Sequence, residues 1–133
     1  MGRENLRIVN QSRGTLLGAD VSLADSWFRR LQGYLGRPEP RRGEGILLAP
    51  CNAIHTYGMS FSVDVIFLSA DGRVVKAMAE VAPGRRSERV AGGRYVLELP
   101  AGTIASTGTS VGDDISWAPA RARAHVGNGA GRG

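Results

Sequence analysis

The amino-acid sequence predicts a mainly β (α+β) fold: a compact, mostly antiparallel β-barrel or sandwich-like single domain with one α-helix in its N-terminal half. Short alternating or apolar segments recur between turn residues, and the chain contains 19 glycines, as is typical of small β-proteins. One early segment has helical periodicity instead. A chain of 133 residues can bury a core within one domain. We therefore expect a single globular unit at residues 5–118.

The predicted strands are short and are separated by turn or loop sequences. Two opening strands are expected in LRIVN and in GTLLGADVSLA, and SADGR predicts a hairpin between two later strands. The segments RPEPRRGEG and GRRSERVAGG are rich in glycine and charge, which is typical of surface loops. The remaining strands are predicted in ILLAP (46–50), FSVDVIFL (61–68), VVKAMAEVAP (74–83), RYVLELP (94–100) and ISW (115–117).

The segment at residues 61–68 alternates clearly. Its odd-numbered residues, from Phe61 to Phe67, are apolar and share one face of the strand. The other face begins with polar residues and becomes apolar, so we expect the far end of the strand to be covered on both sides. We expect the Asp64 carboxylate to accept hydrogen bonds from backbone N–H groups or from the hydroxyl of Thr56. In the later strand, Val96 and Glu98 lie opposite Tyr95, Leu97 and Leu99.

The sequence predicts a helix over residues 23–35. Ser22 precedes the segment, and Asp25 stands three residues after Ser22, which is a loose variant of the capping box. Apolar side chains then recur one turn apart, which indicates a helix that packs one face against the sheet. Gly36 and Pro38 end the segment. The apolar face comprises Leu23, Trp27, Leu31 and Leu35.

Charge and cysteine content limit the classes of function. The formal net charge is +5, but the arginines are scattered or paired, so we do not expect specific nucleic-acid binding. The single cysteine excludes an intramolecular disulfide. No segment approaches the ~18 apolar residues of a membrane span, so we expect a soluble, cytoplasmic protein. The Ala/Arg/Gly-rich tail at residues 119–133 is expected to be disordered.

The stretch CNAIHTYGMSFSVDVIF holds candidate catalytic and metal-binding side chains. Cys51 and His55 could form a thiolate–imidazolium pair with Asp64 orienting the ring, but the segment matches no cysteine-hydrolase signature. The spacing Cys51-x3-His55-x3-Met59 has the ligand types of a copper site, which needs a second imidazole. The other histidine, His125, lies in the tail. We therefore expect no catalytic residue, metal or cofactor here.

A series of motifs resembles one known family. The motifs are LQGYLGR, GEGILL, IHTYGMSFSVDVIFLSADGRVV, YVLELPAGT and GTSVGDDI, and the resemblance that they carry covers roughly residues 5–117. In this order they resemble the small bacterial and archaeal proteins grouped as domain of unknown function 192. The resemblance implies a small β-rich domain for which no catalytic activity is established. It also implies that Asp64, which is shared by two branches of that family, is structural rather than catalytic.

The leading functional hypothesis is a ligand-binding or interaction module. Polar and soft side chains gather where a loop enters a core strand, and such positions often carry binding residues. We expect a cleft there for an unknown small molecule or protein, in a monomeric protein. One alternative is a hydrolase that uses Cys51 with His55, or Asp64; another is a basic surface that binds nucleic acid or acidic partners. The candidate ligand-binding residues are His55, Thr56, Tyr57, Met59, Asp64 and Glu98.

Overall fold

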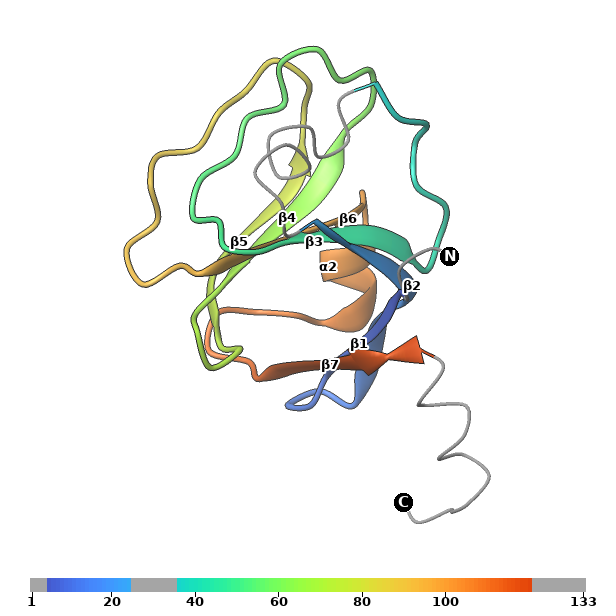
Figure 1. Ribbon diagram of the computed structural model, residues 1–133, viewed down its shortest axis with the longest axis vertical. Coiled ribbons are helices and arrows are strands. Elements are labelled where there is room, and N and C mark those ends of the chain that lie inside the picture. Colours follow the sequence, from blue (N-terminus) through green and yellow to red (C-terminus); the bar gives the residue numbers. More distant parts are fainter. Residues whose placement is uncertain (1–4, 25–35, 121–133) are drawn as a thin grey trace.

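Seven strands form one curled β-sheet, which is the main element of the fold (Figure 1). The computed structural model describes residues 5–24 and 36–120. The elements are β1 (Leu6–Asn10), β2 (Thr15–Ala24), β3 (Glu44–Leu48), β4 (Val63–Leu68), β5 (Val74–Val81), β6 (Tyr95–Pro100), the short helix α2 (Thr103–Thr107) and β7 (Ile115–Pro119). Across the sheet the order is β5-β4-β6-β3-β2-β1-β7. Strands β2 and β3 are parallel, and the other neighbouring strands of the described sheet are antiparallel.

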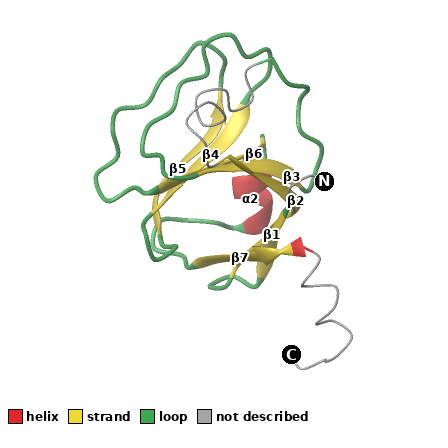
Figure 2. Cartoon of the chain, viewed as in Figure 1, coloured by secondary structure: helices red, strands yellow, loops and turns green. Residues whose placement is uncertain are grey.

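The sheet is a half-barrel, and α2 lies inside its curve (Figures 1 and 2). Irregularities in the pairing of β1 with β2 and of β4 with β5 accompany the curl, since a β-bulge increases the local twist of a sheet. The predicted mainly β single domain is confirmed. Of the two expected architectures, barrel and sandwich, the single curled sheet resembles the barrel. Among the described residues, no helix has the length and apolar composition to cross a membrane.

The two edge strands of the sheet meet at one end. The N–H of Ile115, the first residue of β7, donates to the carbonyl of Gly72 in the β4–β5 turn (2.8 Å). The N–H of Val74, the first residue of β5, donates to the carbonyl of Asp113 (2.9 Å). An isolated β-bridge and a surface ion pair join the same two segments. These contacts link β5 to β7 and close one end of the half-barrel.

A polar cluster fixes the β1–β2 turn to the segment before β7. The Asn10 amide donates to Asp113 Oδ2 (2.9 Å) and to Thr109 Oγ1 (3.1 Å), and the Arg13 Nε also donates to Asp113 (3.1 Å). The Ser110 N–H donates to the same carboxylate (3.0 Å). The hydrogen bonds from Asn10, Ser110 and Arg13 lower the pKa of Asp113 to about 2. At neutral pH the cluster therefore holds a charged carboxylate.

The sheet buries apolar side chains on both faces. The inner core lies within the curve, where Ile104 of α2 packs against it, and the outer core lies on the opposite face. Strand β4 is buried along its whole length because it contributes to both. The inner core comprises Ile8, Leu17, Val21, Leu47, Ile66, Leu68, Val74, Leu97, Leu99 and Ile115; the outer core comprises Ala24, Ile46, Leu48, Ile54, Met59, Val63, Val65, Phe67, Val81 and Val96.

The predicted faces of two central strands are confirmed. In β4, Val63, Val65 and Phe67 belong to the outer core, whereas Ile66 and Leu68 belong to the inner core. In β6, Val96 faces the outer core and Leu97 the inner core. The expectation that the far end of β4 is covered on both sides is therefore correct.

The structure differs from the sequence prediction at two helices. Residues 23 and 24 belonged both to the predicted strand GTLLGADVSLA and to the predicted helix. The strand prediction is confirmed, because residues 22–24 form the end of β2 and pair in parallel with residues 46–48 of β3. The rest of the predicted helix, at residues 25–35, lies outside the described residues. Conversely, α2 was not predicted, because its sequence TIAST is rich in β-branched and hydroxyl side chains that have low helix propensity.

Candidate functional site

Two long loops run beside each other across the outer core (Figures 1 and 2). Residues 49–62 connect β3 to β4, and residues 82–94 connect β5 to β6; we call these two segments the paired loops. Ile54 and Met59 anchor the first loop in the outer core, and backbone hydrogen bonds fix the second loop to it. These bonds run from Cys51 N–H to Arg94 O (2.7 Å), from Val90 N–H to Asn52 O (2.9 Å) and from Ser87 N–H to Ile54 O (2.9 Å).

Thr56 is fully buried and connects the first of the paired loops to the second. Its hydroxyl donates to the carbonyl of Ala82 (2.7 Å) and accepts from the N–H of Arg85 (2.8 Å). Its own N–H donates to the carbonyl of Arg85 (2.7 Å), and its carbonyl accepts from the N–H of Gly84 (3.0 Å). Because all its polar groups are engaged in these bonds, Thr56 holds the residues on either side of it in a fixed position.

His55 and Tyr57 lie on either side of Thr56, and both are exposed. Their rings stack, with centroids 5.2 Å apart and planes inclined by 25°. The Tyr57 N–H donates to His55 Nδ1 (3.3 Å), so in the neutral ring the proton belongs on the other nitrogen. Tyr57 exposes 50% of its surface. The pair therefore presents a planar aromatic surface to the solvent.

Arg85 and Arg86 bring positive charge beside the aromatic pair. His55 forms an isolated β-bridge with Arg86, and Thr56 is bonded to the backbone of Arg85, so the two arginines and the aromatic pair are neighbours across the paired loops. Both arginines are exposed, and neither forms an ion pair with another described residue. The combination is an aromatic surface with adjacent, uncompensated positive charge.

Cys51 and Met59 have environments that differ from that of His55. Met59 is buried in the outer core, and the partly buried Cys51 packs against the same core with its Sγ 3.2 Å from the carbonyl oxygen of Ala53. His55 instead stacks on Tyr57, accepts a hydrogen bond from the Tyr57 N–H and forms a β-bridge with Arg86. No group of three His, Cys, Asp or Glu side chains among the described residues is arranged to hold a metal ion.

Asp64 is fully buried and faces the inner side of the sheet, away from the paired loops. Its Oδ1 accepts from the N–H groups of Glu80 (2.8 Å) and Gly102 (3.2 Å), and its Oδ2 accepts from the N–H of Ile104 (2.7 Å). Glu80 lies at the irregularity in β5 and has a φ of 51°. The predicted bonds from backbone donors are confirmed. The alternative partner, the Thr56 hydroxyl, is wrong because that hydroxyl bonds within the paired loops.

Glu98 is buried on the outer face of β6, between Ile46 of β3 and Val65 of β4. It is 3% exposed, and its Oε1 has no hydrogen-bond partner within the described structure. Burial raises the pKa of Glu98 to about 7, while the positive charge of Arg37 acts in the opposite direction. Near neutral pH the carboxyl group is therefore divided between its neutral and charged forms.

The structure thus brings only part of the predicted site together. His55, Thr56, Tyr57 and Met59 share one loop, where His55 and Tyr57 are exposed and the other two are buried. Glu98 lies on the same face of the sheet as this loop, whereas Asp64 lies on the opposite face. Arg85 and Arg86 were not among the predicted site residues, because their loop read as an ordinary basic surface segment.

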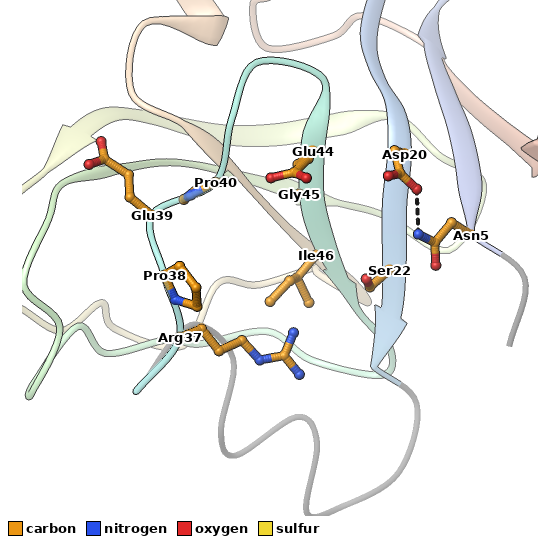
Figure 3. Close-up of a pocket in the computed structure, with 10 residues that line it drawn as sticks. All are labelled: Asn5, Asp20, Ser22, Arg37, Pro38, Glu39, Pro40, Glu44, Gly45 and Ile46. Carbon is orange, nitrogen blue, oxygen red and sulfur yellow. Dashed lines mark hydrogen bonds between the residues drawn. The ribbon is translucent and has the colours of Figure 1, made fainter. Parts of the chain in front are cut away.

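A polar pocket of about 220 Å³ lies beside the parallel strands β2 and β3 (Figure 3). Figure 3 shows side chains from both strands on one side and the segment at residues 37–40 on the other, with Asn5 donating to Asp20. Ile46, which lines this pocket, is the neighbour of Glu98 in the sheet. The lining residues are Asn5, Asp20, Ser22, Arg37, Pro38, Glu39, Pro40, Glu44, Gly45 and Ile46.

A larger pocket, of about 640 Å³, lies between the start of β2, the turn before β3 and the segment that contains α2. None of the predicted site residues lines either of these two pockets. Sequence patterns gave no signal for them, because each pocket combines segments that are far apart in the chain. The larger one is lined by Thr15, Leu16, Leu17, Gly18, Arg42, Gly43, Pro100, Ala101, Gly102, Thr103, Ser106 and Thr107.

Sequence comparison relates this domain to one protein family. The sequence profile of domain of unknown function 192, described as "Uncharacterized ACR", matches residues 8–117. A UPF0127 protein of Thermococcus sibiricus is 31% identical over 114 residues, which cover 83% of this chain and 73% of that protein. A UPF0127 protein of Pyrococcus horikoshii is 35% identical over 114 residues, covering 83% and 97% of the respective chains. The profile match extends from β1 to β7.

Two crystal structures have a similar fold. A protein of unknown function from Novosphingobium aromaticivorans has a TM-score of 0.72 and 24% identity, covering 85% of this chain and 84% of that chain. A protein from Sinorhizobium meliloti, suggested to be a transcription regulator, has a TM-score of 0.71 and 26% identity, covering 86% and 92%. The similarity over most of each chain shows that the half-barrel is shared.

Proposed function

The chain belongs to the family of domain of unknown function 192, and within this family we propose that it is a binding module that recognises an acidic protein partner through its paired loops. The observation that carries the proposal is the exposed His55–Tyr57 stack beside Arg85 and Arg86. Aromatic and arginine side chains are enriched at the energetic centres of protein interfaces. Uncompensated positive charge favours a partner surface that is rich in Asp and Glu.

The fixed geometry of the paired loops supports this role. The buried Thr56 and the backbone bonds between the loops hold His55 and Tyr57 in place before any partner arrives. Binding by a pre-organised surface loses less conformational entropy than binding by a mobile loop. His55 and Tyr57 are both exposed, with Tyr57 exposing 50% of its surface, which supports a protein partner over an enclosed small molecule. We place this interaction in the cytoplasm, with the protein as a monomer.

The two alternatives receive less support from the geometry. A Cys51–His55 nucleophile would need the thiol and the ring hydrogen-bonded, whereas Cys51 Sγ donates to the carbonyl of Ala53 and the His55 ring stacks on Tyr57. A nucleic-acid surface would need a continuous basic face. Among the described residues, the exposed basic side chains lie instead on several elements: Arg13 and Arg73 on turns, Arg41 and Arg42 before β3, Lys76 on β5, and Arg85, Arg86, Arg89 and Arg94 in the second of the paired loops.

Peptide binding measured by fluorescence anisotropy tests the proposal. The full chain is titrated into a labelled peptide composed of Asp, Glu and Trp, into a matched peptide with Lys in place of the acids, and into oligothymidylate of similar charge. We expect saturable binding of the acidic peptide alone. Replacing Tyr57→Ala or Arg86→Gln should weaken it about tenfold, since each removes on the order of 1.4 kcal/mol.

Arg73→Gln provides a matched control, because Arg73 is also exposed but lies in the β4–β5 turn, where it pairs with Asp114. An exposed pair of this kind contributes little to stability, so this variant should bind like the unaltered protein. Tighter binding of oligothymidylate than of the acidic peptide would replace the proposal with the nucleic-acid alternative. An equal loss of affinity in the Arg73 and Arg86 variants would show that only the net charge matters and would also contradict it.

A further inference from the structure

The larger pocket has the size and composition of a small-molecule site. Its volume of about 640 Å³ falls within the range of ligand pockets, roughly 300–1,000 Å³. Its lining combines apolar side chains, several hydroxyl groups and one charged side chain. It shares no residue with the paired loops, so its ligand is independent of the proposed function.

Arg42 is the charged residue of this pocket, and its charge is not compensated. Its guanidinium forms no ion pair and no hydrogen bond with another described residue, and no Asp or Glu is found among the described lining residues. A guanidinium without a protein partner is suited to bind a carboxylate or a phosphate, which it contacts through two parallel hydrogen bonds. The charge of the pocket thus selects an anionic ligand.

The hydroxyl groups of the pocket are committed as donors. The hydroxyl of Thr103 donates to the carbonyl of Pro100 (2.7 Å), and that of Ser106 donates to the carbonyl of Thr103 (3.2 Å). The hydroxyl of Thr15 likewise donates to the carbonyl of Thr107 (2.9 Å). Each hydroxyl oxygen keeps lone pairs that accept hydrogen bonds. A ligand that complements this wall therefore supplies donors, as the hydroxyl groups of a sugar skeleton do.

The backbone holds the Arg42 side of the pocket close to β2. The carbonyl of Gly43 accepts from the N–H of Asp20 (2.9 Å), and Gly43 has a φ of 90°, which favours glycine. A Cβ atom at Gly18 would lie 3.1 Å from the Gly43 carbonyl oxygen and 2.7 Å from Cγ2 of Val21. Leu16 is 44% exposed at this position and adds an apolar surface for a carbon skeleton.

We propose that this pocket binds a small polyhydroxylated organic anion: a carboxylate or a phosphate on a hydroxylated carbon skeleton. Arg42 contacts the anionic group, and the oxygens of Thr15, Thr103 and Ser106 accept from the hydroxyl groups of the ligand. The pocket is large enough for a single sugar-sized unit with its anionic group. Gluconate and glucose 6-phosphate are simple members of the two classes of ligand.

Isothermal titration calorimetry on the full chain, in a buffer without phosphate, tests the pocket. Gluconate and glucose 6-phosphate are titrated separately, beside neutral glucose and inorganic phosphate. We expect saturable binding of at least one of the two sugar anions, with glucose and inorganic phosphate bound at least tenfold more weakly. Binding of gluconate alone identifies a carboxylate site, and binding of glucose 6-phosphate alone identifies a phosphate site.

The substitution Arg42→Gln should weaken binding by about 10- to 100-fold, since a hydrogen bond to a charged group contributes roughly 1.5–3 kcal/mol. Arg41→Gln is the matched control, because Arg41 is the adjacent exposed arginine but does not line the pocket. It should change the affinity by less than about twofold. Ser106→Ala should weaken the binding of the sugar anions by a few fold without changing the weak binding of inorganic phosphate.

Three results would overturn the proposal. The first is the absence of saturable binding of both sugar anions to the folded protein. The second is an equal loss of affinity in the Arg41 and Arg42 variants, which would indicate attraction to the net charge of the molecule. The third is inorganic phosphate binding as tightly as the sugar anions, which would leave a simple anion site. Thermal unfolding of each variant shows whether its substitution has left the fold intact.

Discussion

Asp64 acts as a structural link between three segments of backbone. Its two carboxylate oxygens bind the N–H of Glu80 at the irregular point of β5, the N–H of Gly102 before α2, and the N–H of Ile104 within α2. The positive φ of Glu80 is uncommon for a residue with a side chain and costs roughly 1–3 kcal/mol. The bond from the Glu80 N–H to Asp64 helps to maintain that conformation. The carboxylate thus ties α2 and the irregular point of β5 to the centre of the sheet.

Replacing Asp64→Ala should therefore destabilise the protein far more than His55→Ala. The first substitution leaves three N–H groups without a partner and should lower the free energy of unfolding by at least about 3 kcal/mol. The second removes an exposed ring and should change it by no more than about 0.5 kcal/mol. Urea unfolding followed by circular dichroism measures both. Similar, small effects of the two substitutions would contradict the structural role of Asp64.

Glu98 gives the stability of the protein a distinct dependence on pH. In the folded state its pKa is about 7, above the ordinary value of 4.5, because burial disfavours the charged form. The folded protein therefore retains a proton that the unfolded chain releases. The resulting stabilisation is complete below about pH 4.5 and is lost as the pH rises to about 7. Asp113, with its pKa lowered to about 2, has the opposite effect, but only below its ordinary pKa of 3.8.

The substitution Glu98→Gln should remove this dependence. The amide resembles the neutral carboxylic acid in shape and does not titrate in this range. At pH 8 the variant should be more stable than the unaltered protein, by up to the order of 3 kcal/mol, the equivalent of the shift in pKa. At pH 4.5 the two should differ little. Urea unfolding at both pH values tests this, and equal slopes of stability against pH would contradict it.

Among the elements, strands that lie in the middle of the sheet were the most predictable. The alternation in β4 and β6 reports directly on the two cores, because successive side chains of a strand point to opposite faces. The end of β2 was covered by two overlapping predictions, a strand and the start of a helix, and the helix α2 was not predicted. Ser22 has the features of a helix cap, but parallel pairing with Ile46 extends the strand through it. The N–H of Ile104 in α2 and the N–H of Gly102 just before it donate to the carboxylate of Asp64, a residue distant in sequence.

The candidate site was predictable in its location but not in the directions of its side chains. The sequence indicated the loop that contains His55 and Tyr57 as a candidate site, because polar residues precede a core strand there. It did not reveal that Thr56 and Met59 are buried, since an irregular loop has no periodicity from which burial can be read. It also could not place Arg85 and Arg86 beside His55, because that contact joins different loops.

For the whole molecule, closure of the half-barrel depends on a close approach at Gly72. This glycine has a φ of 87°, and a Cβ atom built on it would lie 2.5 Å from the carbonyl oxygen of Ile115. The same pair forms the hydrogen bond from the Ile115 N–H to the Gly72 carbonyl. A side chain at this position would therefore separate the hairpin of β4 and β5 from β7.

Gly72→Ala should reduce stability by more than Gly84→Ala, the matched control. Gly84 has a similar φ of 81°, but no atom lies within 4 Å of the position that its Cβ would occupy. The control should cost about 1 kcal/mol for the backbone conformation alone, and Gly72→Ala at least about 1 kcal/mol more. Hydrogen exchange at the Ile115 amide should also become faster only in the Gly72 variant. Equal losses of stability in the two variants and unchanged hydrogen exchange would show that the structure accommodates the added Cβ atom without strain.

The pairing of β1 with β7 has a consequence for the synthesis of the protein on the ribosome. Strand β7 emerges roughly 100 residues after β1, which is on the order of 5–20 s later at ordinary rates of translation. During this interval one hydrogen-bonding edge of β1 lacks its native neighbour, and an unpaired edge is a template for pairing with other chains. The nascent chain therefore passes through an aggregation-sensitive period, during which a chaperone that covers the β1 edge would increase the yield of folded protein.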